Sequence, residues 1–280
     1  MLQRFLLVIL LASLTILCVA PDRVRAITYG FVDTNGTYSN VGAFIVQRPS
    51  DGHIFPICSG TLISAGVFLT AGHCTDFFTQ SLAPLGFTAH VSFGSPIGFG
   101  NLTDLNATKT IPVLQVVTNP GFNRTQSDSG DLGVLLVSAS DTIGVTPASL
   151  PSFELLSQLA DKNGLKDAVF TAVGYGVQNR IVGGGPPCFQ DANPVPRMYA
   201  FSSFNALGKG YLRLSQNPAT GNGGTCYGDS GGPNFLDING TRTLAAVTIT
   251  GDTPCRSTNV DYRLDTSSAR QFLAFYVLLP

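Results

Sequence analysis

One serine in this chain has a setting that suits nucleophilic chemistry. Ser230 is the third residue of Gly-Asp-Ser-Gly-Gly-Pro, which spans residues 228–233. A serine hydroxyl is a weak nucleophile unless a neighbouring base takes its proton. The flanking glycines allow a sharp turn and a close approach of the backbone to a bound molecule. The backbone N–H groups of Gly228 and Ser230 could then stabilise a negatively charged oxygen as it forms.

Two further motifs contain the residue types that would activate such a serine. His73 lies in Thr-Ala-Gly-His-Cys and follows an apolar run at 67–69, which predicts a buried strand. Asp131 opens a second apolar run, and burying its charge is costly unless a partner such as an imidazole N–H compensates it. Alone, either residue would more often be structural. Together with the serine motif, they supply the three residue types of a Ser-His-Asp catalytic triad.

The three motifs together resemble those of the chymotrypsin-like serine proteases, the family with the trypsin fold. That family has the same order of residues, and the separations of 58 and 99 residues suit two successive β-barrels with the site between them. The resemblance covers roughly residues 27–280. It implies an all-β fold of two six-stranded antiparallel Greek-key β-barrels with a C-terminal helix.

The resemblance also implies an activity. Members of this family are serine endopeptidases, which hydrolyse peptide bonds through a Ser-His-Asp triad and an acyl-enzyme intermediate. We therefore expect polypeptide substrates, protein protease inhibitors as further partners, no cofactor and a monomer. Asp229 would turn inward and pair with the ammonium group of the mature N-terminus. The N–H groups of Gly228 and Ser230 would form the oxyanion hole.

The resemblance implies a pocket beside the serine for the substrate residue before the cleaved bond. Gly224, six residues before Ser230, would form its floor, and Thr225 and Gly251 would belong to its wall. Trypsin-type enzymes have an aspartate at the floor, so Gly224 favours apolar or small substrate residues. Ile-Thr-Gly at 249–251 replaces the family's Ser-Trp-Gly segment. Three charged residues are near enough in sequence to change the pocket: Asp252, Arg256 and Asp261.

The first 26 residues have the composition of a signal peptide. Arg4 supplies a positive charge, and residues 5–20 form an apolar run of 16 residues, shorter than the roughly 20 that a membrane-spanning helix needs. Cleavage after Ala20 would leave a short propeptide at 21–26 for another protease to remove. Cleavage after Ala26 would expose Ile27 directly, and we hypothesise that this step alone activates the protein. We expect an extracellular protein with no membrane attachment after signal removal, a retained anchor being the alternative.

Secretion makes disulfide bonds the expected state of the cysteines. Cys18 would be removed with the signal peptide, which leaves five. The resemblance implies two bridges, Cys58–Cys74 beside the histidine and Cys226–Cys255 beside the pocket. Cys188 is left over, and we expect a buried thiol there, with a free thiol or an intermolecular link as alternatives. Five sequons permit glycosylation: Asn35, Asn101, Asn106, Asn123 and Asn239.

The composition excludes some classes of function. Charged residues make up 12% of the chain and the net charge is −1, whereas a nucleic-acid-binding protein leaves a basic footprint. The 31 glycines and 17 prolines indicate a turn-rich, all-β chain. No metal site is expected, because the family's calcium loop needs clustered carboxylates after the histidine and residues 77–102 contain none.

The mature chain, 27–280, divides into four predicted parts. They are a first barrel at about 27–145, a connection at about 146–168, a second barrel at about 169–265 and a helix at about 266–280. Ser267 or Ser268 would cap that helix. An apolar stripe at helical spacing predicts a face packed on the core: Phe272, Phe275, Tyr276 and Leu279.

Two other functions fit parts of the pattern. A catalytically silent binding protein on the same fold is the alternative to an enzyme, but such relatives normally lose the serine or the histidine. This chain keeps all three candidates: His73, Asp131 and Ser230. Esterase activity on small acyl groups would use the same chemistry as a side reaction.

Overall fold

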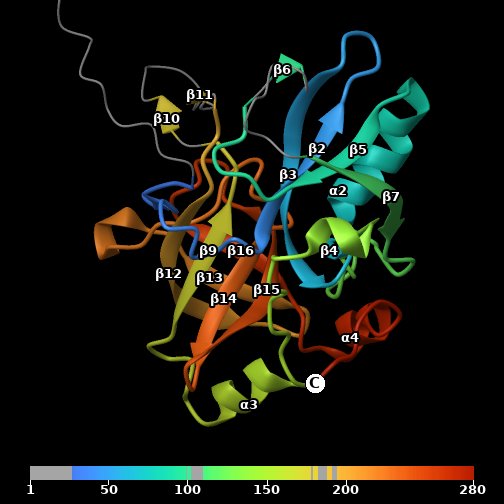
Figure 1. Ribbon diagram of the computed structural model, residues 1–280. Helices are drawn as coiled ribbons and strands as arrows, with labels where there is room; N and C mark the ends of the chain where they lie inside the picture. Colours follow the sequence, from blue (N-terminus) through green and yellow to red (C-terminus); the bar gives the residue numbers. More distant parts are fainter. Residues whose placement is uncertain (1–26, 99, 102–109, 178, 182–187, 191–193) are drawn as a thin grey trace, which may run out of the picture.

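A computed structural model describes residues 27–98, 100–101, 110–177, 179–181, 188–190 and 194–280. The predicted signal peptide, at 1–26, lies outside the described residues. The described chain forms two closed antiparallel β-barrels and a C-terminal helix (Figure 1), which confirms the expected fold class.

The first barrel contains six strands: β2 (Val41–Gln47), β3 (His53–Ser64), β4 (Val67–Thr70), β5 (Thr88–Ser92), β7 (Ile111–Thr118) and β8 (Gly133–Val137). They are hydrogen-bonded in the order β2-β5-β7-β8-β4-β3, and β3 pairs back with β2 to close the barrel. The two-residue strand β6 (Gly100–Asn101) lies beside β3.

Strand β2 illustrates why these residues form a barrel wall. Phe44 and Val46 pack in the largest apolar cluster, whereas Ala43 and Ile45 pack in a separate cluster that includes Tyr175. Successive side chains of a strand point to opposite faces, so an apolar run without polar alternation fits a strand that is covered on both faces.

The second barrel also contains six strands: β9 (Val169–Gly174), β12 (Met198–Leu207), β13 (Tyr211–Ser215), β14 (Pro233–Ile238), β15 (Thr241–Gly251) and β16 (Thr258–Arg263). Their order is β12-β13-β16-β15-β14-β9, and β9 pairs with β12 to close the barrel. Strand β1 (Phe31–Val32) extends this sheet beside β12, and β10 (Asn179–Ile181) forms a separate hairpin with β11 (Cys188–Gln190).

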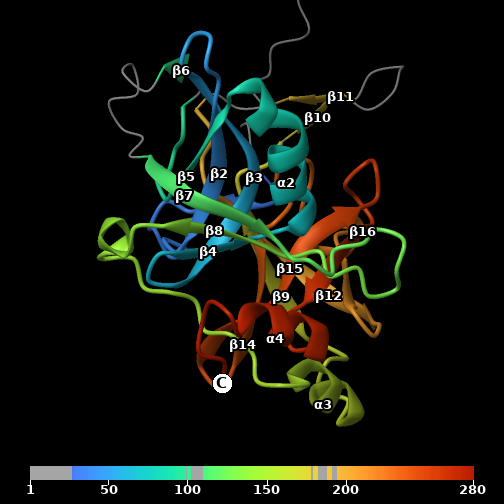
Figure 2. The ribbon, with the colours of Figure 1, turned by 90° about the vertical axis from the view of Figure 1, so that its right-hand side faces the viewer.

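The two barrels share one apolar core. The largest cluster of buried side chains includes Phe68 and Leu135 of the first barrel and Phe235 and Tyr262 of the second. Apolar surface is therefore buried continuously across the boundary between the barrels, which makes a fixed arrangement of one against the other favourable. Figures 1 and 2 show the two barrels in contact from two directions.

Helical segments are few and short. They are α2 (Gly72–Phe77), η1 (Phe78–Leu82), η2 (Ala83–Leu85), η3 (Ala139–Thr142), α3 (Leu155–Asp161), η4 (Pro218–Thr220) and α4 (Ser267–Leu273). In the part of the chain that is described, no helix is long and apolar enough to cross a membrane.

The C-terminal helix differs from its prediction in length and cap. Helix α4 ends at Leu273, and the hydroxyl of Thr266 caps it by accepting a hydrogen bond from the N–H of Ala269, so neither predicted serine is the cap. Phe272 is buried in the core, but Phe275 is 85% exposed, because it lies beyond the helix end. The predicted apolar stripe therefore packs only in part.

Candidate active site

Strand pairing brings His73 and Asp131 together. Strands β4 and β8 are antiparallel, and Thr70 at the end of β4 lies opposite Gly133 at the start of β8. His73 follows Thr70 by three residues and Asp131 precedes Gly133 by two, so both leave the barrel at the same edge. The first turn of α2 then turns the histidine back towards the aspartate.

The carboxylate of Asp131 holds His73 at two points. Its Oδ1 accepts a hydrogen bond from the backbone N–H of His73 at 2.7 Å, and its Oδ2 lies 3.0 Å from His73 Nδ1. The aspartate side chain is 9% exposed and the imidazole 23% exposed. A carboxylate in this position selects the tautomer with the proton on Nδ1, which leaves Nε2 free to accept a proton.

Ser230 lies in a tight turn between β13 and β14 that rests against the first barrel. Gly228 and Gly231 have φ angles of 91° and 84°, which only glycine adopts without strain. The N–H of Ser59 on β3 donates to the carbonyl oxygen of Ser230 at 2.8 Å. A side chain at Gly231 would meet the backbone nitrogen of Ala71, two residues before His73, at 2.8 Å.

The serine turn therefore lies next to the segment that leads into His73. Among the described residues, no hydrogen bond joins His73 Nε2 to Ser230 Oγ. Such bonds are often long without a substrate and tighten when one binds.

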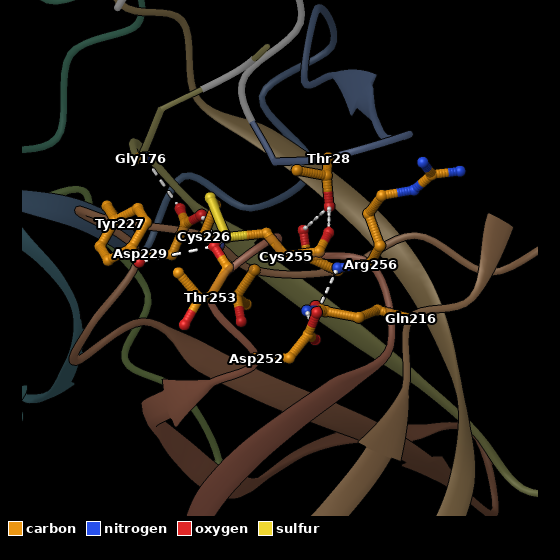
Figure 3. Close-up of a disulfide and its surroundings, with 12 residues drawn as sticks. Thr28, Gly176, Gln216, Cys226, Tyr227, Asp229, Asp252, Thr253, Cys255 and Arg256 are labelled. Atoms are coloured by element: carbon orange, nitrogen blue, oxygen red, sulfur yellow. Dashed lines mark hydrogen bonds between the residues drawn. A yellow bond between two sulfur atoms is a disulfide. The ribbon is translucent and has the colours of Figure 1, made fainter. Parts of the chain in front are cut away.

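Asp229 is fully buried beside this turn. Its Oδ1 accepts from the N–H of Gly176 at 2.8 Å and its Oδ2 from the N–H of Cys226 at 2.9 Å (Figure 3). Burial raises the pKa of Asp229 to about 7, against the opposing effect of these two hydrogen bonds. In the described part of the chain this carboxyl group has no cationic partner.

A cavity of about 350 Å³ opens beside Ser230. Its lining includes Ser230 and two predicted wall residues, Thr225 and Gly251, together with Tyr227, residues 248–250 and 252–253, and the Cys226–Cys255 pair. Gly224, the predicted floor, is not among the lining residues. A larger cavity, about 630 Å³, lies beside α4 and contains none of the candidate site residues.

The model of the Trypsin family matches residues 32–272. This chain belongs to that family. It is 26% identical over 209 residues to Chymotrypsin-like elastase family member 1 of Canis lupus familiaris. The aligned region covers 72% of this chain and 73% of the relative. It is also 26% identical over 180 residues to Vitellin-degrading protease of Bombyx mori, and this aligned region covers 63% of this chain and 61% of the relative. The family and these protease relatives support a serine peptidase function.

The disulfides of this trypsin-family chain are the pairs that the resemblance implied. Cys58 bonds to Cys74 and Cys226 bonds to Cys255. The first bridge links β3 to α2, next to His73. The atoms of Cys58, His73 and Cys74 lie within 4.8 Å of one another, but both sulfur atoms are used in the disulfide and are not available as thiolate ligands.

The surroundings of Gly224 differ from those predicted for the floor of the pocket. Its backbone forms two hydrogen bonds with Thr28, at 2.9 and 3.0 Å. A side chain at this position would meet the amide oxygen of Gln216 at 2.2 Å. The buried Gln216 side chain thus fills the space beyond Gly224, a role that no sequence signal indicated.

The three charged residues near the cavity have different environments. Asp252 lines the cavity, and its carboxylate accepts hydrogen bonds from Gln216 Nε2 and from the backbone N–H groups of residues 256–258. Partial burial raises the pKa of Asp252, but these hydrogen bonds outweigh it and the net pKa is lowered. Figure 3 shows the Arg256 side chain directed away from Asp252. Its guanidinium carbon lies 5.9 Å from the centre of the Tyr29 ring.

Asp261 lies behind the cavity and is fully buried. Its Oδ1 accepts a hydrogen bond from Asn234 Nδ2 at 2.7 Å. Burial raises the pKa of Asp261 well above its usual value, and hydrogen bonds from neighbouring polar side chains only partly oppose this effect. It is therefore not among the groups that face a ligand in the cavity.

Proposed function

We propose that this chain is a secreted serine endopeptidase whose triad is His73, Asp131 and Ser230. The observation that carries the proposal is the Asp131 carboxylate at 3.0 Å from His73 Nδ1, on the segment against which the serine turn packs. Membership of the Trypsin family supports the reaction class. Partial sequence identity to two proteases agrees with it.

Each residue has a distinct role in the proposed reaction. Ser230 Oγ attacks the carbonyl carbon of the substrate while His73 Nε2 accepts the hydroxyl proton. Asp131 holds the imidazole in the required orientation and stabilises its cationic form. The N–H groups of Gly228 and Ser230 bind the developing oxyanion. His73 then donates its proton to the leaving amine, and water releases the acyl group by the same steps in reverse.

The mature protein would begin at Ile27. The Ile27 side chain is fully buried against Ala172, Met198 and Ala200, and Thr28 is bound to Gly224 by two backbone hydrogen bonds. In a chain that starts here, the terminal ammonium group would pair with the buried Asp229 carboxylate, which otherwise has no cationic partner among the described residues. N-terminal sequencing of the secreted protein tests this start against one at Pro21.

The cavity favours a small or apolar side chain before the cleaved bond. Among the described residues that line it, Asp252 has the only carboxylate, and this carboxylate already accepts three backbone hydrogen bonds and one from Gln216, so these donors compensate its charge. Cleavage of matched peptides with alanine, leucine or arginine at that position tests the preference. Faster cleavage after arginine would contradict it.

A fluorophosphonate probe tests the proposed activity directly. The purified protein starting at Ile27 should be labelled on Ser230, and labelling should disappear in Ser230→Ala and fall strongly in His73→Ala. Ser157→Ala, which replaces a serine outside the site, is the matched control and should label normally. Absence of labelling in a folded wild-type protein, alongside a reactive control protease, would favour the catalytically silent binding protein.

A further inference from the structure

Three consecutive backbone N–H groups follow strand β9, and two of them bond the turn that contains Ser230. Tyr175 N–H donates to Ser59 Oγ at 3.0 Å, and Gly176 N–H donates to Asp229 Oδ1 at 2.8 Å. Val177 N–H donates to the carbonyl oxygen of Tyr227 at 2.7 Å. The segment Tyr175–Val177 therefore serves as a template for the turn, and Figure 3 shows its middle residue facing Asp229.

The third of these bonds fixes the peptide unit that carries the Gly228 N–H. In a trans peptide the C=O and N–H point in opposite directions within one plane. Because the carbonyl of Tyr227 points to Val177, the N–H of Gly228 points away from it. Gly176 allows this approach, since a side chain there would meet the Tyr227 carbonyl oxygen at 2.6 Å.

The second peptide unit of Gly228 is fixed by a side chain of the first barrel. Ser59 Oγ donates to the carbonyl oxygen of Gly228 at 3.0 Å. Ser59 is fully buried on β3, so its single proton goes to Gly228 and a lone pair accepts from Tyr175. Gly228 has a φ of 91° and little intrinsic preference among conformations, so hydrogen bonds on both sides decide its orientation.

We propose that Ser59 is a positioning residue for the oxyanion hole: its hydroxyl fixes the peptide unit after Gly228, the Val177 N–H fixes the unit before it, and the two bonds together hold the Gly228 conformation that directs its N–H. This inference rests on the proposed function. Ser59 touches neither the candidate nucleophile's hydroxyl nor the imidazole in any hydrogen bond of the described chain, and it acts through the backbone of Gly228. Its effect is confined to the step in which negative charge develops on the substrate oxygen.

Because the packing around Ser59 is close, its replacement by alanine and its replacement by glycine should have different effects. A side chain at Gly174 would meet Ser59 Oγ at 3.0 Å, and one at Gly232 would meet its Cβ at 3.3 Å, so there is no spare room. In Ser59→Ala the methyl group excludes water and leaves the Gly228 carbonyl and the Tyr175 N–H without a partner. In Ser59→Gly the freed space is about that of one water molecule, which can bridge the same two groups.

The experiment compares these variants in steady-state kinetics and in binding of a peptide aldehyde, which forms a tetrahedral adduct with an oxyanion. Ser59→Ala should lower kcat about tenfold, less than the loss of a whole oxyanion donor, with little change in KM. Aldehyde affinity should fall by the same factor. Ser59→Gly should recover part of kcat and remain about two- to fivefold below wild type, because its water is not covalently held. Fluorophosphonate titration corrects each rate for the fraction of active protein.

Thr142→Val is the matched control. Thr142 is also buried, and its hydroxyl also accepts from one backbone N–H, of Gly66, and donates to one carbonyl, of Ala139. Thr142 belongs to η3 and bonds the turn between β3 and β4, and it does not line the cavity beside Ser230. Its loss should lower thermal stability as much as Ser59→Ala does, with wild-type kcat and aldehyde affinity.

Several outcomes overturn the inference. Wild-type kcat in both Ser59 variants would do so. A rise in KM with unchanged kcat would also overturn it. Equal losses of kcat in Thr142→Val would assign the effect to general destabilisation. If Ser59→Ala does not fold, wild-type kcat in Ser59→Gly is by itself sufficient to overturn it. Failure of the proposed function is a separate result, since the wild-type protein would then not be labelled or titrated at all.

Discussion

The buried carboxyl group of Asp229 should make the stability of the unprocessed chain depend on pH. Burial raises its pKa from a usual value of 3.8 to about 7, so the folded protein binds the proton more tightly than the unfolded chain. The free energy of unfolding must then fall as pH rises from about 4 to about 7, and it is constant above that. About three pKa units at about 1.4 kcal/mol each correspond to roughly 4 kcal/mol.

The assay is urea unfolding between pH 4 and pH 8 of a chain that begins at Pro21, with Asp229 or with Asp229→Asn. A Ser230→Ala background prevents self-digestion. The asparagine cannot ionise, so the difference in free energy between the two proteins isolates the Asp229 carboxyl group from all others. As pH rises across this range, the protein with Asp229 should lose roughly 4 kcal/mol of unfolding free energy relative to the protein with asparagine. A flat difference would refute the claim that the buried charge is uncompensated.

The chain that begins at Ile27 provides the second half of the test. If its ammonium group pairs with Asp229 as proposed, it lowers the pKa of Asp229, and the decline in stability between pH 4 and pH 7 should shrink or reverse. If both chains lose stability equally over this range, the ammonium group does not reach Asp229 and the proposed mature start is wrong.

Three further predictions concern the triad, a buried ion pair and a disulfide. The double variant His73→Ala/Ser230→Ala should lose little more peptidase activity than either single variant, because the two residues act as a unit, and cleavage rates of one peptide compare them. Arg197→Met should destabilise the protein by about 3–5 kcal/mol in urea unfolding, because it removes the cationic partner of the buried Asp33 carboxylate, which lies 2.8 Å from the guanidinium. Cys226→Ser should cost about 2–5 kcal/mol in the same assay, because it removes the bridge beside the cavity.

The fold class could be predicted because the motifs that carry the family resemblance are local in the sequence. The apolar run at 67–69 lies in strand β4 and the run after Asp131 lies in strand β8, so both predicted strands are present, with His73 in α2 after the first and Asp131 two residues before the second. Which edge of the barrel they share depends on the pairing of Thr70 with Gly133, a long-range contact that no local pattern contains. Family resemblance supplied that information, as it supplied the two disulfide pairs.

Predictions failed where the result depends on which of several similar residues takes a role, or on which side chain the folded barrel brings to a position. Thr266 was overlooked as the cap of α4 because three adjacent hydroxyl residues, 266–268, are equally good caps in sequence. Helical periodicity continued to Leu279, but the helix ends at Leu273, and nothing in the periodicity marks that end. Gln216 was missed because it lies on β13's end, eight residues from Gly224, and only the folded barrel brings its side chain there.

The role of Ser59 could not be predicted from the sequence for a related reason, because its contacts are long-range. These contacts are relevant to the proposed activation. The hydrogen bonds that hold Gly228 come from Ser59 and Val177, and neither involves a residue before Ile27. The backbone of the oxyanion turn is therefore held in the same way whether or not the chain has been processed. The proposed processing would instead change the charge balance at Asp229, which has two backbone donors and no cation among the described residues. It follows that Ser59 variants should lower kcat by the same factor in the Pro21 and Ile27 chains wherever both are active. An effect of Ser59 restricted to one of them would mean that the ammonium group also orients Gly228.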